Sequence, residues 1–244
     1  MIRILKNLDQ VSSAAAEELV KSAVSAVEKR GVFRIALSGG STPKTLFSNL
    51  VSDQEFKKQM PWQSTHFFWS DERTVPPDHA DSNFRMAREA MFKHVEVSET
   101  QIHRIHAEED PNHAAEEYEK EIRKHFNISA PQLPSFDLIL LGMGPDGHTA
   151  SLFPGTEALK EQKRLVVSNW VSKFNTHRIT FTVPLINHAA AVMFLVCGED
   201  KAATLKAVLE GPRDPEVYPS QLIKPDGDLI WFVDQAAGKL LELD

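Results

Sequence analysis

Short runs of apolar residues alternate along the chain with longer segments in which apolar residues recur at helical spacing. The runs predict buried strands, because a strand covered on both faces reads as a continuous apolar stretch. They are FRIAL (33–37), THFFW (65–69), FDLILL (136–141), RLVV (164–167), RITFTV (178–183), AVMFLVC (191–197) and DLIWFV (228–233). This alternation is typical of an α/β fold, and we expect a mostly parallel central sheet flanked by helices.

Helices are predicted between these strands from apolar spacing and from Pro, Gly and Asp at the expected ends. We predict them over about 11–30, from Pro43, over about 83–92, from Asp110-Pro111, over about 200–211 and, as a short closing helix, after Asp234. The sequence has no internal repeat or flexible linker between them. We therefore expect a single domain over 1–244, with all the strands in one sheet.

Composition and charge narrow the kind of partner. Of the 244 residues, 42% are hydrophobic and 25% are charged, which is ordinary for a soluble globular protein. A formal net charge of −7 disfavours nucleic acid and anionic membranes, which attract clustered cations. The first residues, MIRILKNLDQV, do not resemble a secretory signal, and the sequence lacks a long apolar span. We expect a cytoplasmic protein, and the sequence does not distinguish a monomer from a weak homo-oligomer.

Three glycines follow the FDLILL run, in the stretch LLGMGPDGHTAS (140–151). Their spacing fits G-x-G-x-x-G, the motif of a dinucleotide-binding turn. That motif expects an acidic residue at the end of the next strand, where this chain has Ser168 and Asn169. Asp146 would also place a negative charge close to a pyrophosphate. These features argue against a nicotinamide or flavin site, so no such cofactor is expected.

Asp146 and His148 are the reactive side chains of the same stretch. Histidine exchanges protons near neutral pH, so His148 is a candidate general base, and a nearby carboxylate such as Asp146 can orient the imidazole. The alternative is that Gly147 supplies an unusual backbone angle and His148 only caps the next helix. Spacing alone does not decide between these two interpretations.

A second glycine-containing loop, SGGSTP (38–43), follows the FRIAL strand. Ser41 or Thr42 can cap the following helix, and Pro43 suits its first turn. Free backbone N–H groups at a helix N-terminus bind anions, so this loop predicts a phosphate site, although it lacks the Walker spacing.

Further charged residues lie next to predicted strand ends. Asp71, Glu72 and Arg73 follow the THFFW strand, Arg178 opens another strand, and Lys201 begins a helix. A lysine in the first turn of a helix opposes the helix dipole, so a nearby anion would explain its place there. We expect the phosphate loop, Arg178 and Lys201 to hold an anion beside a reaction centre that the acidic residues help to line.

Metal ligation and a covalent mechanism find little support in the sequence. His103 and His106 are three residues apart on a polar stretch, without a zinc motif or a nearby thiolate. The one cysteine, Cys197, ends an apolar run and is interpreted as a buried core thiol. There is no G-x-S-x-G elbow to carry a serine nucleophile. We expect neither a metal nor an organic cofactor.

Taken together and in this order, five segments resemble the 6-phosphogluconolactonase family, over a match from about Phe33 to the C-terminal region. The segments are ALSGGSTP, WSDER…DSN, LGMGPDGHTASLFPG, RITFTVPLIN and GEDKA. The resemblance implies a Rossmann-like fold of the glucosamine-6-phosphate deaminase/ribose-5-phosphate isomerase type. It also implies hydrolysis of 6-phospho-D-glucono-1,5-lactone in the oxidative pentose phosphate pathway, without a cofactor or catalytic metal.

The resemblance also implies roles for individual residues. Gly39, Gly40, Ser41 and Thr42 would hold the substrate phosphate, with Arg178 and Lys201 as its counter-charges. Arg73 would lie in the pocket with Asp71 and Glu72, and His148 would be the general base beside Asp146.

Two rivals share parts of this pattern. Glucosamine-6-phosphate deaminase has the phosphate loop and the G-x-D-G-H turn, but in that family the histidine is followed by an Asn-Glu pair. This chain continues as HTASLFPG (148–155), with no acidic residue before Glu157. A sugar-phosphate-sensing regulatory domain would keep the pocket, but would be expected to add a DNA-binding segment and a basic face.

Overall fold

The computed structural model describes residues 1–242, and six strands form its central sheet. They are β1 (Ile2–Leu5), β2 (Phe33–Leu37), β3 (Thr65–Trp69), β5 (Leu138–Gly142), β8 (Ala191–Val196) and β9 (Asp228–Asp234). The spatial order is β1-β9-β8-β5-β2-β3, and every neighbouring pair is parallel. The predicted parallel α/β architecture is therefore confirmed, and the FRIAL and THFFW strands have the predicted bounds.

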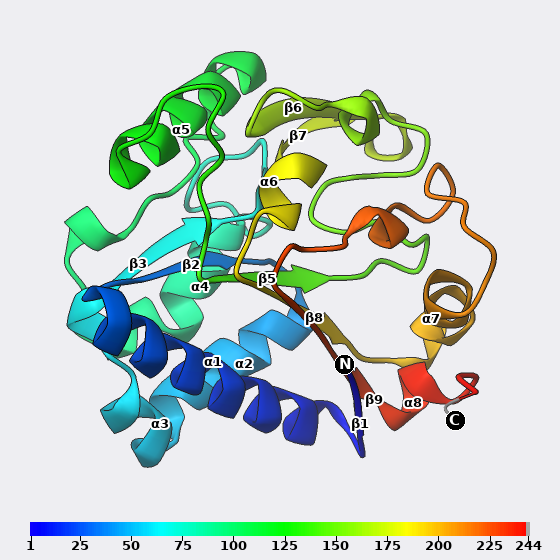
Figure 1. Ribbon diagram of the computed structural model, residues 1–244, viewed down its shortest axis with the longest axis horizontal. Coiled ribbons are helices and arrows are strands. Elements are labelled where there is room, and N and C mark those ends of the chain that lie inside the picture. The colour runs from blue at the N-terminus through cyan, green and yellow to red at the C-terminus, as the bar shows by residue number, and fades with distance from the viewer. Residues whose placement is uncertain (243–244) are drawn as a thin grey trace.

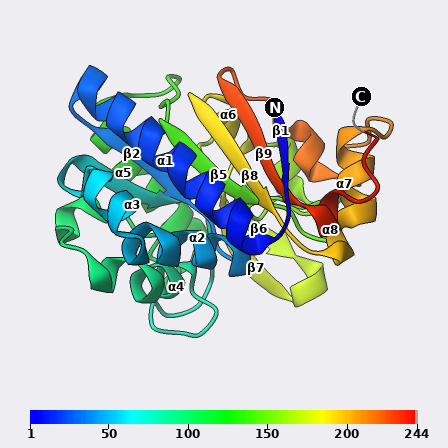
Figure 2. The same ribbon diagram turned by 90° about the horizontal axis from the view of Figure 1, so that it is seen from below.

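Helices cover both faces of this sheet (Figures 1 and 2). They are α1 (Leu8–Arg30), α2 (Ser41–Ser52), α3 (Gln54–Gln59), α4 (Asn83–Ala90), α5 (Pro111–Phe126), α6 (Val183–Asn187), α7 (Ala202–Leu209) and α8 (Gln235–Gly238). Figure 1 shows α1, α2 and α3 on one side of the sheet, with α5 and α6 on the other. None of the helices in residues 1–242 combines the length and the apolar character that crossing a membrane requires.

Capping side chains fix several helix ends where the sequence predicts them. Asp110 accepts hydrogen bonds from the backbone N–H groups of Asn112 and His113 at the start of α5. Asp234 accepts one from Ala237 N at the start of α8. Both predicted caps are confirmed.

A second, smaller sheet corrects one prediction. It contains β4 (Asp71–Arg73), β6 (Val166–Val171) and β7 (Thr176–Phe181), in the antiparallel order β4-β7-β6. The RLVV and RITFTV runs therefore do not continue the central sheet. Only residues 172–175 connect β6 to β7, and so short a connection permits a hairpin but not a parallel crossover. The segment Asp71–Arg73, which was not among the predicted strands, forms β4.

The order of the central strands places a crevice at the ends of β2 and β5. These strands are neighbours, but the chain continues from β2 to β3 on one side, while β8 and β9 follow β5 on the other. Ligands of open α/β sheets bind at such a reversal of strand order, beyond the carboxyl ends of the strands. The fold therefore brings together the loops that follow β2 and β5.

Candidate active site

A cavity of about 240 Å³ lies at this reversal of strand order. Its walls come from the loops that follow β2, β5 and β8, together with β4 of the small sheet. The lining residues are Ser38, Gly39, Gly40, Ser41, Thr42, Pro43, Asp71, Arg73, Gly142, Met143, Gly144, His148, Ala150, Leu195, Cys197 and Lys201. Most of the residues predicted from the sequence therefore meet in one place, whereas Asp146, Glu72 and Arg178 lie outside this lining.

The loop after β2, which the sequence predicts to bind phosphate, forms one wall of the cavity. Gly40 has a φ of 105°, a conformation that favours glycine, and it immediately precedes α2. The backbone N–H groups of Gly40, Ser41 and Thr42 have no hydrogen-bond partner among residues 1–242. They stand at the N-terminus of a 12-residue helix, where unpaired amides and the helix dipole attract an anion.

Gly39 is required for a different reason. A Cβ atom at this position would lie 1.9 Å from Oδ1 of Asn83, the first residue of α4. The Asn83 amide in turn donates a hydrogen bond to the backbone oxygen of Asp71, at 3.0 Å. The phosphate loop therefore packs directly against α4, and only glycine permits the contact.

His148 is held on the cavity wall by Asp146. Nδ1 of the imidazole is hydrogen-bonded to Oδ1 of Asp146, and the ring stacks on Phe153 with centroids 4.1 Å apart. A carboxylate only accepts hydrogen bonds, so Nδ1 carries the proton and Nε2 is the basic nitrogen. Within residues 1–242 no group hydrogen-bonds Nε2. The side chain is 24% exposed, so this nitrogen is both oriented and available.

Lys173, which the sequence analysis did not single out, completes this arrangement. Its Nζ lies 2.9 Å from Oδ2 of Asp146, the carboxylate oxygen that does not contact His148. Burial raises the pKa of Asp146, but hydrogen bonds from His148 and Lys173 outweigh burial and hold that pKa well below its usual range. Asp146 is therefore ionised and fixed between a lysine and the imidazole.

Replacing Lys173 tests its role as a positioning residue. In Lys173→Met the negative charge of Asp146 is no longer neutralised, so it stabilises a protonated imidazole more strongly. The acid limb of the kcat/KM profile is then expected to move to higher pH, with a fall of a few-fold in rate near neutrality. A pH–rate series on both proteins measures this shift. Lys160→Met, which removes an exposed lysine paired with Glu157, is the control and should leave the profile unchanged.

In the glycine turn after β5, the amides of Gly144 and Gly147 are hydrogen-bonded inside the turn. The Gly144 N–H donates to the backbone oxygen of His148 at 2.9 Å, and the Gly147 N–H donates to that of Gly144 at 3.0 Å. These bonds fold the turn around His148 instead of directing its amides outward. The turn therefore serves to place the imidazole, and the nicotinamide or flavin interpretation finds no support in its geometry.

Asp71 and Glu72 have different positions although they are adjacent. Asp71 lines the cavity and accepts a hydrogen bond from the Ser151 hydroxyl at 2.6 Å. The Glu72 carboxylate is buried, and it accepts hydrogen bonds from the backbone N–H groups of Arg73, Asn83 and Phe84. Burial raises the pKa of Glu72, and these three bonds partly offset the effect. This geometry braces β4 against α4 and gives Glu72 no contact with the cavity.

Arg73 and Arg178 face each other across the β4–β7 pair. Arg73 lines the cavity and donates to the backbone oxygen of Asp81 at 2.8 Å. Arg178 does not line it, and its guanidinium has no hydrogen bond or ion pair within residues 1–242 and lies 5.5 Å from the centre of the Phe174 ring. Burial lowers the pKa of Arg178, and the charge of Arg73 lowers it further. Two like charges opposite each other are destabilising, which an anion between them would relieve.

Lys201 and Cys197 border the cavity on the side of β8. Lys201 is the residue that precedes α7, as predicted, and its side chain is ion-paired with the exposed Asp200. Cys197 is only partly buried and lines the cavity, so the expectation of a core position is wrong. Burial and the nearby Asp234 raise the pKa of Cys197 to about 12, which keeps it a thiol and not a nucleophile.

Fold and cavity together define an α/β protein in which unpaired amides at a helix N-terminus and an oriented imidazole share one cavity. The sequence matches a family described as glucosamine-6-phosphate isomerases/6-phosphogluconolactonase over residues 6–231, and the chain belongs to this family.

Several known proteins are similar to this chain along most of its length. It is 46% identical over 217 residues to a 6-phosphogluconolactonase of Synechocystis sp., covering 88% of each chain. It is 43% identical over 219 residues to one of Nostoc sp., covering 89% of this chain and 88% of the relative. The solved structure of 6-phosphogluconolactonase from Trypanosoma cruzi superposes with a TM-score of 0.85 at 29% identity, covering 99% of this chain and 97% of that one.

Proposed function

We propose that this enzyme hydrolyses 6-phospho-D-glucono-1,5-lactone to 6-phospho-D-gluconate in the cytoplasm, with His148 as the general base. The observation that carries the proposal is the imidazole that Asp146 holds on one wall of a cavity whose other wall is the phosphate loop. The names of the similar 6-phosphogluconolactonases support the same reaction. The net charge of −7 agrees with a small-molecule substrate and not with nucleic acid.

The phosphate of the substrate binds the loop that includes Ser41 and Thr42, with Lys201 as its counter-charge. Unpaired amides at the start of α2 supply hydrogen bonds along the helix axis, and Lys201 borders the same cavity. Because the phosphate lies far from the reacting carbonyl, its binding energy fixes the lactone in one orientation. Arg178, opposite Arg73 on β7, adds positive potential beside the cavity.

Hydrolysis then needs one proton transfer in each direction. Nε2 of His148 takes a proton from water as the water oxygen attacks the lactone carbonyl, and a tetrahedral oxyanion forms. The protonated imidazole next gives its proton to the ring oxygen as the ester bond breaks. Asp146 stabilises the imidazolium between these steps, and no covalent intermediate is required.

Arg73 is the group best placed to stabilise the oxyanion. The amides of Gly144 and Gly147 are already bonded inside the turn, so they are not available as donors. Arg73 lines the cavity, and a positive donor directed at a developing negative charge is an effective stabiliser.

The deaminase interpretation finds less support in the segment that follows His148. The Thr149 hydroxyl donates to the backbone oxygen of Gly142 at 2.8 Å, and Ser151 donates to Asp71. The chain has no acidic residue between His148 and Glu157, so this segment does not supply the acid that ring opening and ammonia chemistry would use. Among the described residues, Asp71 is the only carboxylate that lines the cavity.

A rate assay distinguishes the two activities directly. The purified protein should hydrolyse 6-phosphogluconolactone well above the spontaneous rate, and should release no ammonia from glucosamine 6-phosphate. Hydrolysis no faster than the buffer, or ammonia release at a comparable rate, would contradict the proposal.

Lys201→Ala is expected to raise KM by roughly ten- to hundredfold with little change in kcat. The loss corresponds to one charge-assisted phosphate contact, about 1.5–3 kcal/mol. Steady-state kinetics on the phosphorylated lactone measure it. The matched control is Lys206→Ala in α7, because Lys206 pairs with Glu210 and Glu242 and does not line the cavity. An equal loss on unphosphorylated gluconolactone would show that Lys201 does not act on the phosphate.

A further inference from the structure

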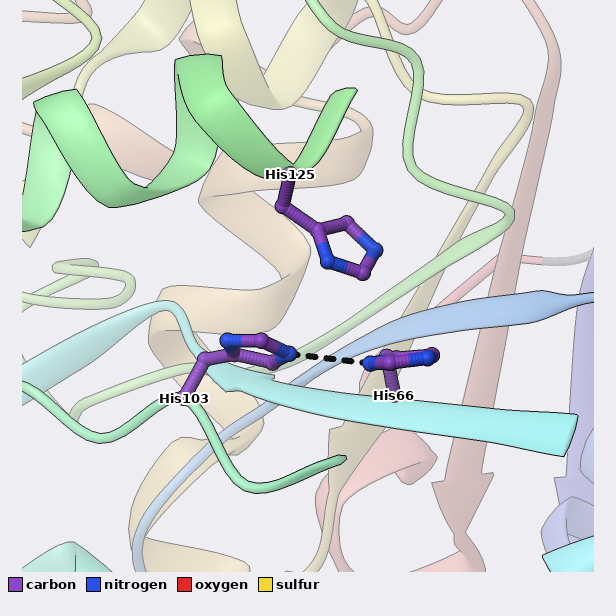
Figure 3. Close-up of side chains that lie close together, drawn as sticks. All are labelled: His66, His103 and His125. Atoms are coloured by element: carbon purple, nitrogen blue, oxygen red, sulfur yellow. Dashed lines mark hydrogen bonds between the residues drawn. The ribbon is translucent and has the colours of Figure 1, made fainter. Parts of the chain in front are cut away.

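Three histidines from distant parts of the sequence converge on the α5 side of the central sheet (Figure 3). His66 is the second residue of β3, His103 follows the short turn at Glu99–Gln101, and His125 is in the last turn of α5. One ring nitrogen from each lies within 4.8 Å of the others. Nδ1 of His66 and Nε2 of His103 are hydrogen-bonded at 2.9 Å.

We propose that these three imidazoles bind a divalent transition-metal ion, with Zn²⁺ as the expected occupant. Neutral imidazole is a preferred ligand of Zn²⁺ and of its neighbours in the first transition series, and a set of three histidines is a known zinc donor set. Mg²⁺ and Ca²⁺ prefer oxygen ligands and are not expected here.

The rings are in the protonation state that a metal requires. Burial, with the neighbouring His103 and Arg34, lowers the pKa of His66 to about 4. Burial, with the neighbouring His66, His103 and Arg34, lowers the pKa of His125 to about 3. Both rings are therefore neutral at physiological pH, so neither has to lose a net proton before it binds a cation. In His66 the proton only has to move from Nδ1, which donates to His103, to the other ring nitrogen.

The geometry needs only a small adjustment. Around a tetrahedral ion with bonds of about 2.0–2.1 Å, ligand nitrogens lie about 3.3 Å apart. The His66–His103 pair, at 2.9 Å, opens slightly to admit the ion between the two nitrogens. The widest separation, at most 4.8 Å, closes by no more than about 1.5 Å. His125 is at the end of a helix, where a side-chain rotation can supply this movement.

Glu121 gives the cluster the outer support that metal sites use. Its Oε1 lies 2.7 Å from Nδ1 of His103, so that nitrogen carries the proton and Nε2 presents its lone pair to His66. A carboxylate behind a histidine ligand fixes the ring and makes it a stronger donor. The His103 ring also stacks on Phe68, with centroids 4.2 Å apart and an angle of 8°. Its side chain is only 11% exposed.

Arg34 opposes metal binding and so offers a variant with the opposite effect. Its Nε donates to Nε2 of His125 at 3.2 Å. If the metal uses that nitrogen it displaces Arg34, and if it uses Nδ1 the proton moves to Nε2 and the arginine loses its acceptor. Either way the positive guanidinium competes with the ion.

This cluster is separate from the active site. His66 pairs with Arg34 at the amino ends of β3 and β2, whereas the cavity lies beyond the carboxyl ends. The three residue-to-residue steps from His66 to Trp69 span about 10 Å of strand. A bound ion would join β3 to α5 and the loop between them, and it would have no contact with the substrate.

Titration with Co²⁺ as a spectroscopic probe tests the proposal on the whole protein. One Co²⁺ per chain is expected, with the visible absorption of a four-coordinate ion, and Zn²⁺ should displace it and raise Tm. Glu121→Gln should weaken binding about 10- to 100-fold, as loss of an outer-shell partner does. Arg34→Met should strengthen it.

Four further variants make the outcome decisive. His103→Ala and His125→Gln should abolish the absorption band while circular dichroism in EDTA shows that each remains folded. His188→Ala, which removes an exposed histidine paired with Asp226, and His148→Asn, which removes the active-site imidazole, should both keep the band. Absence of the band in the wild-type protein overturns the proposal. So does its survival in both cluster variants, or its loss in His148→Asn.

Discussion

His148→Ala is expected to lower kcat by roughly 10²- to 10⁴-fold, the usual contribution of a general base. The imidazole is the only cavity-lining group within residues 1–242 that combines a basic nitrogen with a fixed orientation. Its removal leaves the phosphate loop in place, so KM for the phosphorylated lactone should change little. The measurement is the initial rate at several substrate concentrations, corrected for spontaneous hydrolysis.

Two further variants distinguish the loss of the general base from a loss of the folded structure. His148→Asn keeps a hydrogen-bond donor for Asp146 but has no basic nitrogen, so it should be as slow as the alanine variant. The exposed His188, which pairs with Asp226, provides the control, and His188→Ala should turn over like the wild type. The acid limb of the pH–rate profile should also disappear from the residual activity of both His148 variants. Wild-type turnover in His148→Ala would remove this residue from the mechanism.

Most strands of the central sheet were predictable because they are buried on both faces, whereas the partly exposed edge strand β1 was not predicted. In both FRIAL and THFFW every residue except the second, Arg34 or His66, is buried, and the apolar runs marked the bounds of these strands directly. The small sheet was harder to predict. In β6, buried and partly exposed residues mix, and β4 has only three residues, all charged. The apolar signal in these strands did not reveal which sheet they belong to, whereas the short connection between β6 and β7 could have shown it.

In the site, too, contacts between residues close in sequence could be predicted, whereas contacts made only by the tertiary fold could not. Asp146 and His148 are two residues apart in one turn, so their contact is local and could be predicted from the sequence. Lys173 reaches Asp146 only because the β6–β7 hairpin folds over the turn, and no local pattern indicates that. The one feature of the sequence that sets Lys173 apart is its position in the connection between β6 and β7, next to the exposed Phe174.

Glu72 shows the limit of inferring a role from proximity in sequence. A carboxylate next to a strand end can face a pocket or can brace the backbone. Side chains alternate along β4, so the two neighbours of Glu72 share one face of the strand and Glu72 lies on the other. Asp71 and Arg73 line the cavity, while Glu72 points the other way and accepts hydrogen bonds from backbone N–H groups at the start of α4. The histidine cluster was missed for a related reason, because His66, His103 and His125 have no common sequence spacing.

Gly144→Ala is expected to reduce kcat by about 100-fold or more without changing His148 itself. A Cβ atom at position 144 would lie 2.1 Å from both Nδ1 and Cε1 of His148, and 2.7 Å from Oδ1 of Asp146. These atoms cannot remain there, so the imidazole has to move, and a misplacement of about 1 Å can cost a factor of 10² in rate. Steady-state kinetics should show the loss mainly in kcat, because the phosphate loop belongs to a different strand end.

The neighbouring glycine supplies the matched control. A Cβ atom at Gly142 meets no atom within 4 Å, so Gly142→Ala adds the same methyl group to the same turn without touching His148. Because Gly142 also lines the cavity, the added methyl group is expected to act on KM and not on kcat, which should stay near the wild-type value. Both variants should retain the wild-type Tm to within a few degrees. An equal loss in the two variants would mean that the turn tolerates no added carbon anywhere. A wild-type rate in Gly144→Ala would mean that catalysis does not depend on where Asp146 holds the ring. Only a loss confined to position 144 shows that the glycines of this turn make room for an imidazole, and not for a nucleotide.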